Sequence, residues 1–426
     1  MTSRRVPRAV AIITGDELLR GFIQDANSGF LADQLRDMGV ELAEVRIVGD
    51  DFDSIGTAIA DTTRGPLAAD LIILSGGLGP THDDRTSEAV ALAVGRELVV
   101  DEAALELVGA RVRAFGRMRT PEEVATFTPG NRKQASLPRG ATWVDPLGTA
   151  PGYVLTSEEL TFVVLPGPPP ELRHAWKGVR ATAELQAVLA RTAPAHERLL
   201  RMWGVPESAA SRTLDATGHD DSDARRVTIC ARDGEVEISV RGTDVASVDA
   251  LVDGLTTEFG PAVFAVDDHR SVVEFIADEL RARGWMLATC ESCTGGQLGS
   301  ALTEVAGSSA WYEGGLVTYS YASKTLLAGV PATLIASDGA VSESVARAMA
   351  EGVRATLGVD VGVGITGIAG PGGGTEAKPV GTVHLAVATP AGIVHRQIRV
   401  PGDRSTVRRR SSHVALHLLR ESLRDA

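Results

Sequence analysis

The chain has 426 residues, more than one ordinary hydrophobic core accommodates, so two or three domains are expected. Hydrophobic residues make up 44% of it and charged residues 23%, which is typical of a soluble globular protein. The net charge of −13 argues against a nucleic-acid partner, and no apolar run approaches the roughly 18 to 20 residues of a membrane span. The first apolar run is also too short for a secretory signal, so we expect a cytoplasmic protein without nucleic-acid or membrane partners.

Residues 1–174 alternate strand-like and helix-like segments. Short apolar runs at residues 10–13, 71–74 and 162–165 suit strands that are buried on both faces of a parallel sheet. Apolar residues at helical spacing lie between them, and this βαβ pattern predicts a doubly wound α/β domain. A loop rich in glycine, proline or acidic residues follows each run. These three loops are expected to converge on the sheet edge where ligands bind.

The loop after the second run has the composition of a phosphate and metal site. It combines glycines, a hydroxyl and two carboxylates: Gly76, Gly77, Gly79, Thr81, Asp83 and Asp84. Glycines let backbone N–H groups approach an anion closely, and paired carboxylates can hold a divalent cation against phosphate oxygens. Glu17, at a neighbouring strand end, is a further candidate metal ligand. The alternative is a tight turn in which an aspartate caps the next helix.

Two further units follow. Residues 175–266 begin with an Ala-rich helical segment and continue with two alternating runs around the turn at 231–235, which predicts a small α+β module. Residues 268–426 open with an amphipathic helix and contain strands that end in the Gly-rich loops ESCTGG and TGIAGPGGG. We predict a third, α/β domain there. Cys290 and Cys293 have C-x-x-C spacing but too few partners for a zinc site, so we interpret them as pocket-wall residues.

Lys324 is unusual because only four of the 42 basic residues in the chain are lysine. A serine nucleophile needs a base, and a lysine with a lowered pKa can serve, whereas arginine does not deprotonate. The turn Gly307-Ser308-Ser309 precedes Lys324, and Arg404 stands before the last helix, whose start favours anions. This combination suits acyl transfer on a phosphorylated substrate. An exposed surface lysine is the alternative.

The N-terminal motifs resemble those of the CinA family (competence/damage-inducible protein A). The matching segments are GDELLRGFIQDANSGFLADQL, SGGLGPTHDDRTSE, LGTAPGY and LPGPPPE. The resemblance implies a molybdopterin-binding-like domain with metal-dependent ADP-ribose pyrophosphatase activity, in which Asn27 is a polar contact to the ligand. Ala26 stands where the family usually has Thr, and Asp145 where it usually has Asn. The family's middle module is KH-like, but the RNA-clamping G-x-x-G loop is absent here.

The C-terminal motifs resemble those of the CinA C-terminal domain, a PncC-type nicotinamide mononucleotide deamidase. The matching segments are ESCTGG, AGSSAWYEGG, VTYS with its following lysine, GAVSESVA, TGIAGPGGG, KPVGTV and GDR. The resemblance implies that Ser309 is the nucleophile and Lys324 its base, with Tyr319 nearby. It also implies a pocket made of Ser292, Thr294, Thr366, Gly370 and Arg404. Tyr321 departs from the usual Asn.

The expected protein is thus a two-activity hydrolase, and as a family member we expect it to be a homodimer. Its substrates would be nicotinamide mononucleotide and ADP-ribose. A divalent metal would serve the N-terminal site, and the amidase would need no cofactor. Two alternatives stay open: a non-catalytic partner protein in competence or DNA-damage responses, and a protein in which only the C-terminal domain is active while the N-terminal domain binds a ligand.

Overall fold

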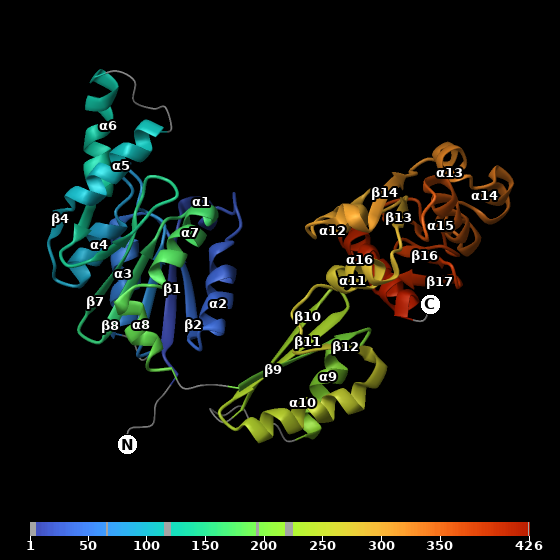
Figure 1. The fold of residues 1–426 in the computed structure, drawn as a ribbon, viewed down its shortest axis with the longest axis horizontal. Coiled ribbons are helices and arrows are strands. Elements are labelled where there is room, and N and C mark those ends of the chain that lie inside the picture. The colour runs from blue at the N-terminus through green and yellow to red at the C-terminus, as the bar shows by residue number, and fades with distance from the viewer. Residues whose placement is uncertain (1–5, 65–66, 115–120, 193–195, 218–224, 425) are drawn as a thin grey trace. The chain divides into compact units, whose positions relative to one another are not determined.

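The computed structural model describes residues 6–64, 67–114, 121–192, 196–217, 225–424 and 426 (Figure 1). The chain divides into two compact units, residues 1–195 and 196–426. The boundary predicted after residue 174 is wrong, since it falls inside helix α7 (Pro169–Val179). Trp176 and Val179 of this helix, and Leu185 of the next, are buried in the core of the first unit, so both helices belong to it.

The first unit is a mixed sheet with helices on both faces, which confirms the doubly wound α/β prediction. Its strand order is β2-β1-β3-β8-β7-β6, with β2, β1, β3 and β8 parallel. Its elements are β1 (Arg8–Thr14), α1 (Asp16–Leu19), α2 (Asn27–Asp37), β2 (Glu41–Val48), α3 (Phe52–Arg64), β3 (Leu71–Ser75), α4 (Thr86–Ala93), β4 (Leu98–Val100), α5 (Glu102–Ala114), α6 (Pro121–Gln134), β5 (Ser136–Pro138), β6 (Thr142–Val144), β7 (Gly152–Ser157), β8 (Leu160–Leu165), α7, and α8 (Ala183–Leu189).

Strand β1 shows why the apolar runs are continuous. Ala11 and Ile13 pack into the core beneath α2 and α7, while Val10 and Ile12 pack into the core beneath α3 and α4. Both faces of the strand are therefore covered, as in parallel sheets generally. The parallel pairing also brings the loops after β1, β3 and β8 to one edge.

The second unit contains two sheets with separate cores. Its elements are β9 (His196–Trp203), α9 (Glu207–Ala216), β10 (Arg226–Arg232), β11 (Glu235–Gly242), α10 (Val245–Phe259), η1 (Gly260–Ala262), β12 (Val263–Val266), α11 (Val272–Arg283), β13 (Leu287–Glu291), α12 (Gln297–Thr303), η2 (Ser308–Ala310), β14 (Tyr312–Val317), α13 (Tyr321–Ala328), α14 (Ala332–Asp338), α15 (Glu343–Leu357), β15 (Val361–Gly367), β16 (Thr382–Thr389), β17 (Gly392–Arg399) and α16 (Arg404–Arg424).

The module from β9 to β12 has the strand order β10-β11-β9-β12, with all neighbouring strands antiparallel. This arrangement confirms the α+β class, and its chain order is that of a split βαβ unit. It packs on the last helix of the chain. The Trp203 ring stacks on the His417 ring with centroids 3.8 Å apart, and Glu235 pairs with the same His417 at 2.8 Å.

The C-terminal sheet has the order β14-β13-β15-β16-β17, with β14, β13 and β15 parallel. Strands β16 and β17 form the antiparallel pair predicted around residues 390–392. Helix α15 covers one face and helices α11 and α16 the other. In the described part of the chain, no helix is both long and apolar enough to cross a bilayer.

Helix α15 lies so close to β15 that the strand carries glycine where the two meet. A Cβ added at Gly364 would lie 2.4 Å from the carbonyl oxygen of Ala346, and one at Gly362 would lie 2.1 Å from that of Ala350. Backbone atoms cannot yield as a flexible side chain does, so any larger residue must push the helix off the sheet.

We predict that Gly364→Ala lowers the free energy of unfolding of the second unit by about 1–3 kcal/mol, because overpacking forces backbone shifts. Gly372→Ala is the matched control, since an added Cβ there meets no atom within 4 Å. Urea unfolding followed by tryptophan fluorescence measures both. Equal stability of the two variants would contradict the close packing.

Candidate functional sites

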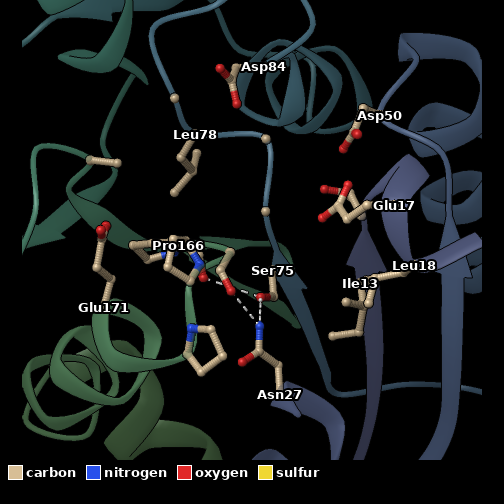
Figure 2. A pocket seen from close by; sticks show the side chains of 18 of the residues that line it. Ile13, Glu17, Leu18, Asn27, Asp50, Ser75, Leu78, Asp84, Pro166 and Glu171 are labelled. Carbon is tan, nitrogen blue, oxygen red and sulfur yellow. Dashed lines mark hydrogen bonds between the residues drawn. The ribbon is translucent and has the colours of Figure 1, made fainter. Parts of the chain in front are cut away.

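A cavity of about 510 Å³ lies at the sheet edge where β1, β3 and β8 end (Figure 2). Residues from all three predicted loops line it, so their expected convergence is confirmed. The predicted residues among the lining are Glu17, Asn27, Gly76, Gly77, Gly79, Asp83 and Asp84. Thr81 stands next to this lining and contacts the two aspartates.

Asn27 is buried and ties the cavity wall together. Its Nδ2 donates to Ser75 Oγ at 3.0 Å and to the Gly167 carbonyl at 2.7 Å, as the dashed lines in Figure 2 show. Its Oδ1 is buried without a hydrogen-bond partner. The amide N–H groups therefore hold two loops in place, and only the carbonyl side of Asn27 is left for another partner.

Asp83 and Asp84 converge on a single hydroxyl. Both carboxylates contact Thr81 Oγ1, and Asp84 also accepts from the Thr81 N–H at 2.9 Å. The hydroxyl holds the pKa of Asp83 below its ordinary value. One hydroxyl proton can satisfy only one carboxylate. A cation that shares both carboxylates would remove this conflict, and Mg²⁺ is commonly held by one or two carboxylates together with substrate phosphates.

Glu17 does not join this pair. It follows β1 and lies beside Asp50, at the end of β2, while Asp84 lies on the other loop (Figure 2). Among the described residues, no group of three or more His, Cys, Asp or Glu side chains is placed to hold a metal. The structure therefore does not group Glu17 with Asp83 and Asp84, and the role of Glu17 as a metal ligand stays a prediction.

Besides Asp25, two acidic residues of this cavity, Asp50 and Glu171, were not predicted from the sequence. Burial is the main cause of a raised pKa for both, and the nearby charges of Glu17 and Asp16 add to the effect at Asp50. The position of Asp50 directly after a strand was a usable signal. Glu171 is part of the PGPPPE loop, but nothing in the sequence showed that it would be half-buried.

The lining is acidic throughout. Its ionisable side chains are six carboxylates: Glu17, Asp25, Asp50, Asp83, Asp84 and Glu171. None of the lining residues that the structure describes is Lys, Arg or His. Beside this lining the Lys133 amine donates to the Thr81 carbonyl, and such a balance of charge favours an anionic ligand that enters together with cations.

The C-terminal domain holds a buried serine–lysine pair. Lys324, on α13, is 1% exposed, and its Nζ donates to Ser292 Oγ at 2.8 Å and to the Thr318 carbonyl at 2.7 Å. Burial lowers the pKa of Lys324. Neither hydrogen-bond partner is a carboxylate that would stabilise the charged amine, so the site favours neutral lysine.

Ser309 is not the partner of Lys324. It lies exposed in η2, just before β14, and makes no hydrogen bond within the described chain. Because β13 and β14 are parallel, Ser309 lies at the edge where β13 begins, whereas Ser292 follows the end of β13. The assignment of Ser309 as the residue paired with Lys324 is therefore corrected to Ser292, which the sequence analysis had placed in the pocket.

The turn that carries Ser292 is fixed by the strand before it and the helix after it. The Ser292 N–H donates to the Ile365 carbonyl at 2.9 Å. The buried Glu291 carboxylate accepts from the N–H groups of Gly296, Leu298 and Gly299 at the start of α12, at 3.0, 3.1 and 2.8 Å. Charge-assisted bonds of this kind are stronger than neutral ones. They hold the turn at the carboxyl end of β13.

The other predicted pocket residues differ in their hydrogen bonds. Arg404 donates to the Gly370 carbonyl and to the Tyr319 hydroxyl, both at 2.9 Å. Thr366 Oγ1 donates to the Ala340 carbonyl at 2.7 Å, while the Thr294 hydroxyl is buried without a partner. Tyr319 is exposed and faces Arg404, and no hydrogen bond joins it to Lys324 in the described residues.

Cys290 and Cys293 are free and buried. Burial raises the pKa of the Cys290 thiol to about 11 and that of the Cys293 thiol to about 12. Thiols with such values are almost entirely protonated at neutral pH and are poor nucleophiles and metal ligands. Both cysteines therefore serve as walls around Lys324.

The N-terminal and C-terminal parts of the chain match different protein families. Residues 10–183 match the probable molybdopterin binding domain, and residues 269–423 match the CinA C-terminal domain. A competence-damaged protein (CinA) superfamily protein from Klebsiella pneumoniae is 36% identical, covers 37% of this chain and 100% of its own, and superposes with a TM-score of 0.35.

Relatives match over nearly the whole length. A CinA-like protein of Mycobacterium sp. (strain JLS) is 45% identical over 98% of this chain and 99% of the relative. A CinA-like protein of Anaeromyxobacter dehalogenans (strain 2CP-C) is 43% identical over 97% of this chain and 99% of the relative. Given this identity over both domains and the module between them, the chain belongs to the CinA family.

Proposed function

We propose that the C-terminal domain is an amidohydrolase that converts nicotinamide mononucleotide to nicotinic acid mononucleotide and ammonia. The observation that carries the proposal is the 2.8 Å hydrogen bond between the buried Lys324 amine and Ser292 Oγ. Serine–lysine pairs of this kind activate serine for attack on a carbonyl. The nucleotide substrate is the one that the family resemblance implies.

Neutral Lys324 takes the Ser292 proton as Oγ forms a bond to the carboxamide carbon. The resulting ammonium then gives a proton to the leaving nitrogen, so that ammonia departs and an ester of Ser292 remains. Water then attacks this ester as Lys324 accepts its proton, and the lysine returns that proton to Ser292 Oγ as the ester bond breaks and the acid product leaves. The backbone N–H groups of Cys293 and Thr294, which directly follow the nucleophile, are the candidate donors to the oxyanion.

Lys324 suits this role because its amine is held in place and kept from being permanently charged. The Thr318 carbonyl accepts one N–H of the amine at 2.7 Å, and the 2.8 Å separation from Ser292 Oγ lets the lone pair of neutral Lys324 accept the serine proton. Arg404, at the start of α16, is a candidate partner for the phosphate, since its guanidinium lies at a helix N-terminus.

We further propose that the N-terminal cavity hydrolyses ADP-ribose with the help of a divalent cation. Asp83 and Asp84 would hold the ion, which would neutralise phosphate charge, and the glycines of the β3 loop would offer backbone N–H groups. Asp50 is the candidate proton acceptor, because its pKa is raised toward neutrality by burial and by Glu17. The all-acidic lining supports the need for a cation. Homodimerisation and a cytoplasmic location stay predictions.

The first prediction separates the two serines. Ser292→Ala should abolish ammonia release from nicotinamide mononucleotide, because among the described residues no other hydroxyl bonds the Lys324 amine. Ser309→Ala, the matched control, should stay within about twofold of wild type, as expected for a surface substitution. An enzyme-coupled ammonia assay measures both. Loss of activity only in the Ser309 variant would reverse the assignment, and no turnover by wild type would favour the non-catalytic reading.

The second prediction concerns pH. Burial lowers the pKa of Lys324 from the ordinary lysine value of about 10.4. The neutral amine therefore forms at a lower pH than it would in an exposed lysine. kcat/KM should therefore rise with pH through a single deprotonation and level off once Lys324 is neutral. Lys324→Arg should lose about 10²–10⁴-fold, the usual contribution of a general base. If kcat/KM did not change with pH below the plateau, or if Lys324→Arg were active, the role of Lys324 as base would be contradicted.

The third prediction tests the N-terminal site. Asp84→Asn should remove metal-dependent release of AMP from ADP-ribose, while Asp33→Asn, at an exposed position on α2, should not. Calorimetry of ADP-ribose binding with and without Mg²⁺ separates catalysis from binding. Binding without any AMP release by wild type would support a ligand-binding N-terminal domain instead.

A further inference from the structure

Helix α16 brings two arginines, one helical turn apart, to the loops of the amidase site. Residues four apart lie on the same face of a helix. Arg404 reaches the loop after β15 through the Gly370 carbonyl and the segment after β14 through the Tyr319 hydroxyl. Arg408 reaches the loop after β13, which carries Ser292. One helix face therefore contacts all three loops.

The contact of Arg408 is with the backbone of the catalytic turn. Its Nε donates to the Thr294 carbonyl at 3.2 Å and its Nη2 donates to the same oxygen at 2.8 Å. A Cβ added at Gly295 would lie 3.5 Å from this Nη2, so the guanidinium also lies against the next residue of the turn. Arg408 thus touches the turn within three residues of Ser292 without contacting the serine itself.

One backbone hydrogen bond closes the turn, from the Gly295 N–H to the Ser292 carbonyl at 3.1 Å, and Arg408 adds a side-chain contact to its middle. Gly295 and Gly296 have φ values of +61° and +91°, a conformation that glycine adopts easily and leaves just as easily. Neither contributes a side chain to packing. Glu291 fixes the N–H groups from Gly296 onward. Between Ser292 and Gly296, the Thr294 carbonyl accepts from Arg408 and, at 3.4 Å, from the Gln297 N–H.

We propose that Arg408 is a positioning residue for the amidohydrolase: it holds the Thr294 carbonyl and so keeps Ser292 Oγ within hydrogen-bond distance of Lys324. The inference rests on the proposed function of this site. A planar guanidinium can place two N–H groups on one oxygen and so resist rotation of the peptide, whereas a lysine ammonium would offer a single donor. Arginine is therefore the residue suited to this place.

The test compares Arg408→Met with Arg410→Met in the full chain. Arg410 lies on the same helix and makes no hydrogen bond or ion pair within the described residues, so it controls for losing an arginine from α16. Arg408→Met should lower kcat for nicotinamide mononucleotide by about 10- to 100-fold, because small misplacements of reacting groups cost that much. KM should change less than about threefold, since the hydrogen bonds of Arg408 go to the Thr294 carbonyl and not to Arg404, the candidate phosphate partner.

Two further variants guard against a merely structural effect. Arg408→Lys should recover part of kcat by giving one donor to the Thr294 carbonyl, and guanidinium ion at millimolar concentration should raise kcat of Arg408→Ala. Thermal unfolding of each variant shows whether the fold is retained. Full kcat in Arg408→Met, equal losses in the Arg410 control, or a folded Arg408→Ala variant that guanidinium does not rescue would overturn the proposal.

Hydrogen exchange separates this inference from the proposed reaction. Amides of residues 292–299 should exchange faster in Arg408→Met than in Arg410→Met, whether or not the wild type releases ammonia. Faster exchange together with an inactive wild type would sink the proposed function and keep Arg408 as the support of the turn. Unchanged exchange in Arg408→Met, with an active wild type, would sink the role of Arg408 alone.

Discussion

The proposed amidase site depends on one hydrogen bond inside the protein, from the Lys324 amine to Ser292 Oγ. Burying an amine without a carboxylate partner disfavours its charged form. This burial costs the folded state stability and leaves a neutral amine that can act as a base. The surroundings maintain this condition, because the neighbouring thiols of Cys290 and Cys293 stay protonated and the Thr318 carbonyl fixes the amine without charging it. The Glu291 carboxylate and the Ile365 carbonyl hold the turn that brings Ser292 to that amine.

The N-terminal cavity differs from the Lys324 site because it gathers charged side chains instead of excluding charge. Six carboxylates line it and no described lining residue is cationic, so like charges are gathered rather than avoided. Burial, together with the nearby charges of Glu17 and Asp16, raises the pKa of Asp50, and two carboxylates share the Thr81 hydroxyl. Six neighbouring carboxylates repel one another and do not stabilise the fold. We therefore infer that they bind cations that accompany an anionic ligand.

The sequence predicted the sheets well because burial leaves a direct mark on it. The continuous apolar run in β1 indicated two covered faces, and the Gly-rich segments after β3 and β13 indicated ligand loops. Lys324 was singled out by composition alone. Its partner was not found that way, since Ser292 and Ser309 both lie in Gly-containing turns, and only the parallel pairing of β13 with β14 separates their edges.

The most direct test of the central claim is to trap the acyl-enzyme. The full-length protein would be quenched in acid during turnover of nicotinamide mononucleotide, digested, and analysed by fragmentation mass spectrometry. We expect a nicotinoyl-nucleotide ester on Ser292 in the wild type and none in Lys324→Arg, with Ser309 unmodified in both. An adduct on Ser309, or ammonia release by Ser292→Ala at the wild-type rate, would contradict it.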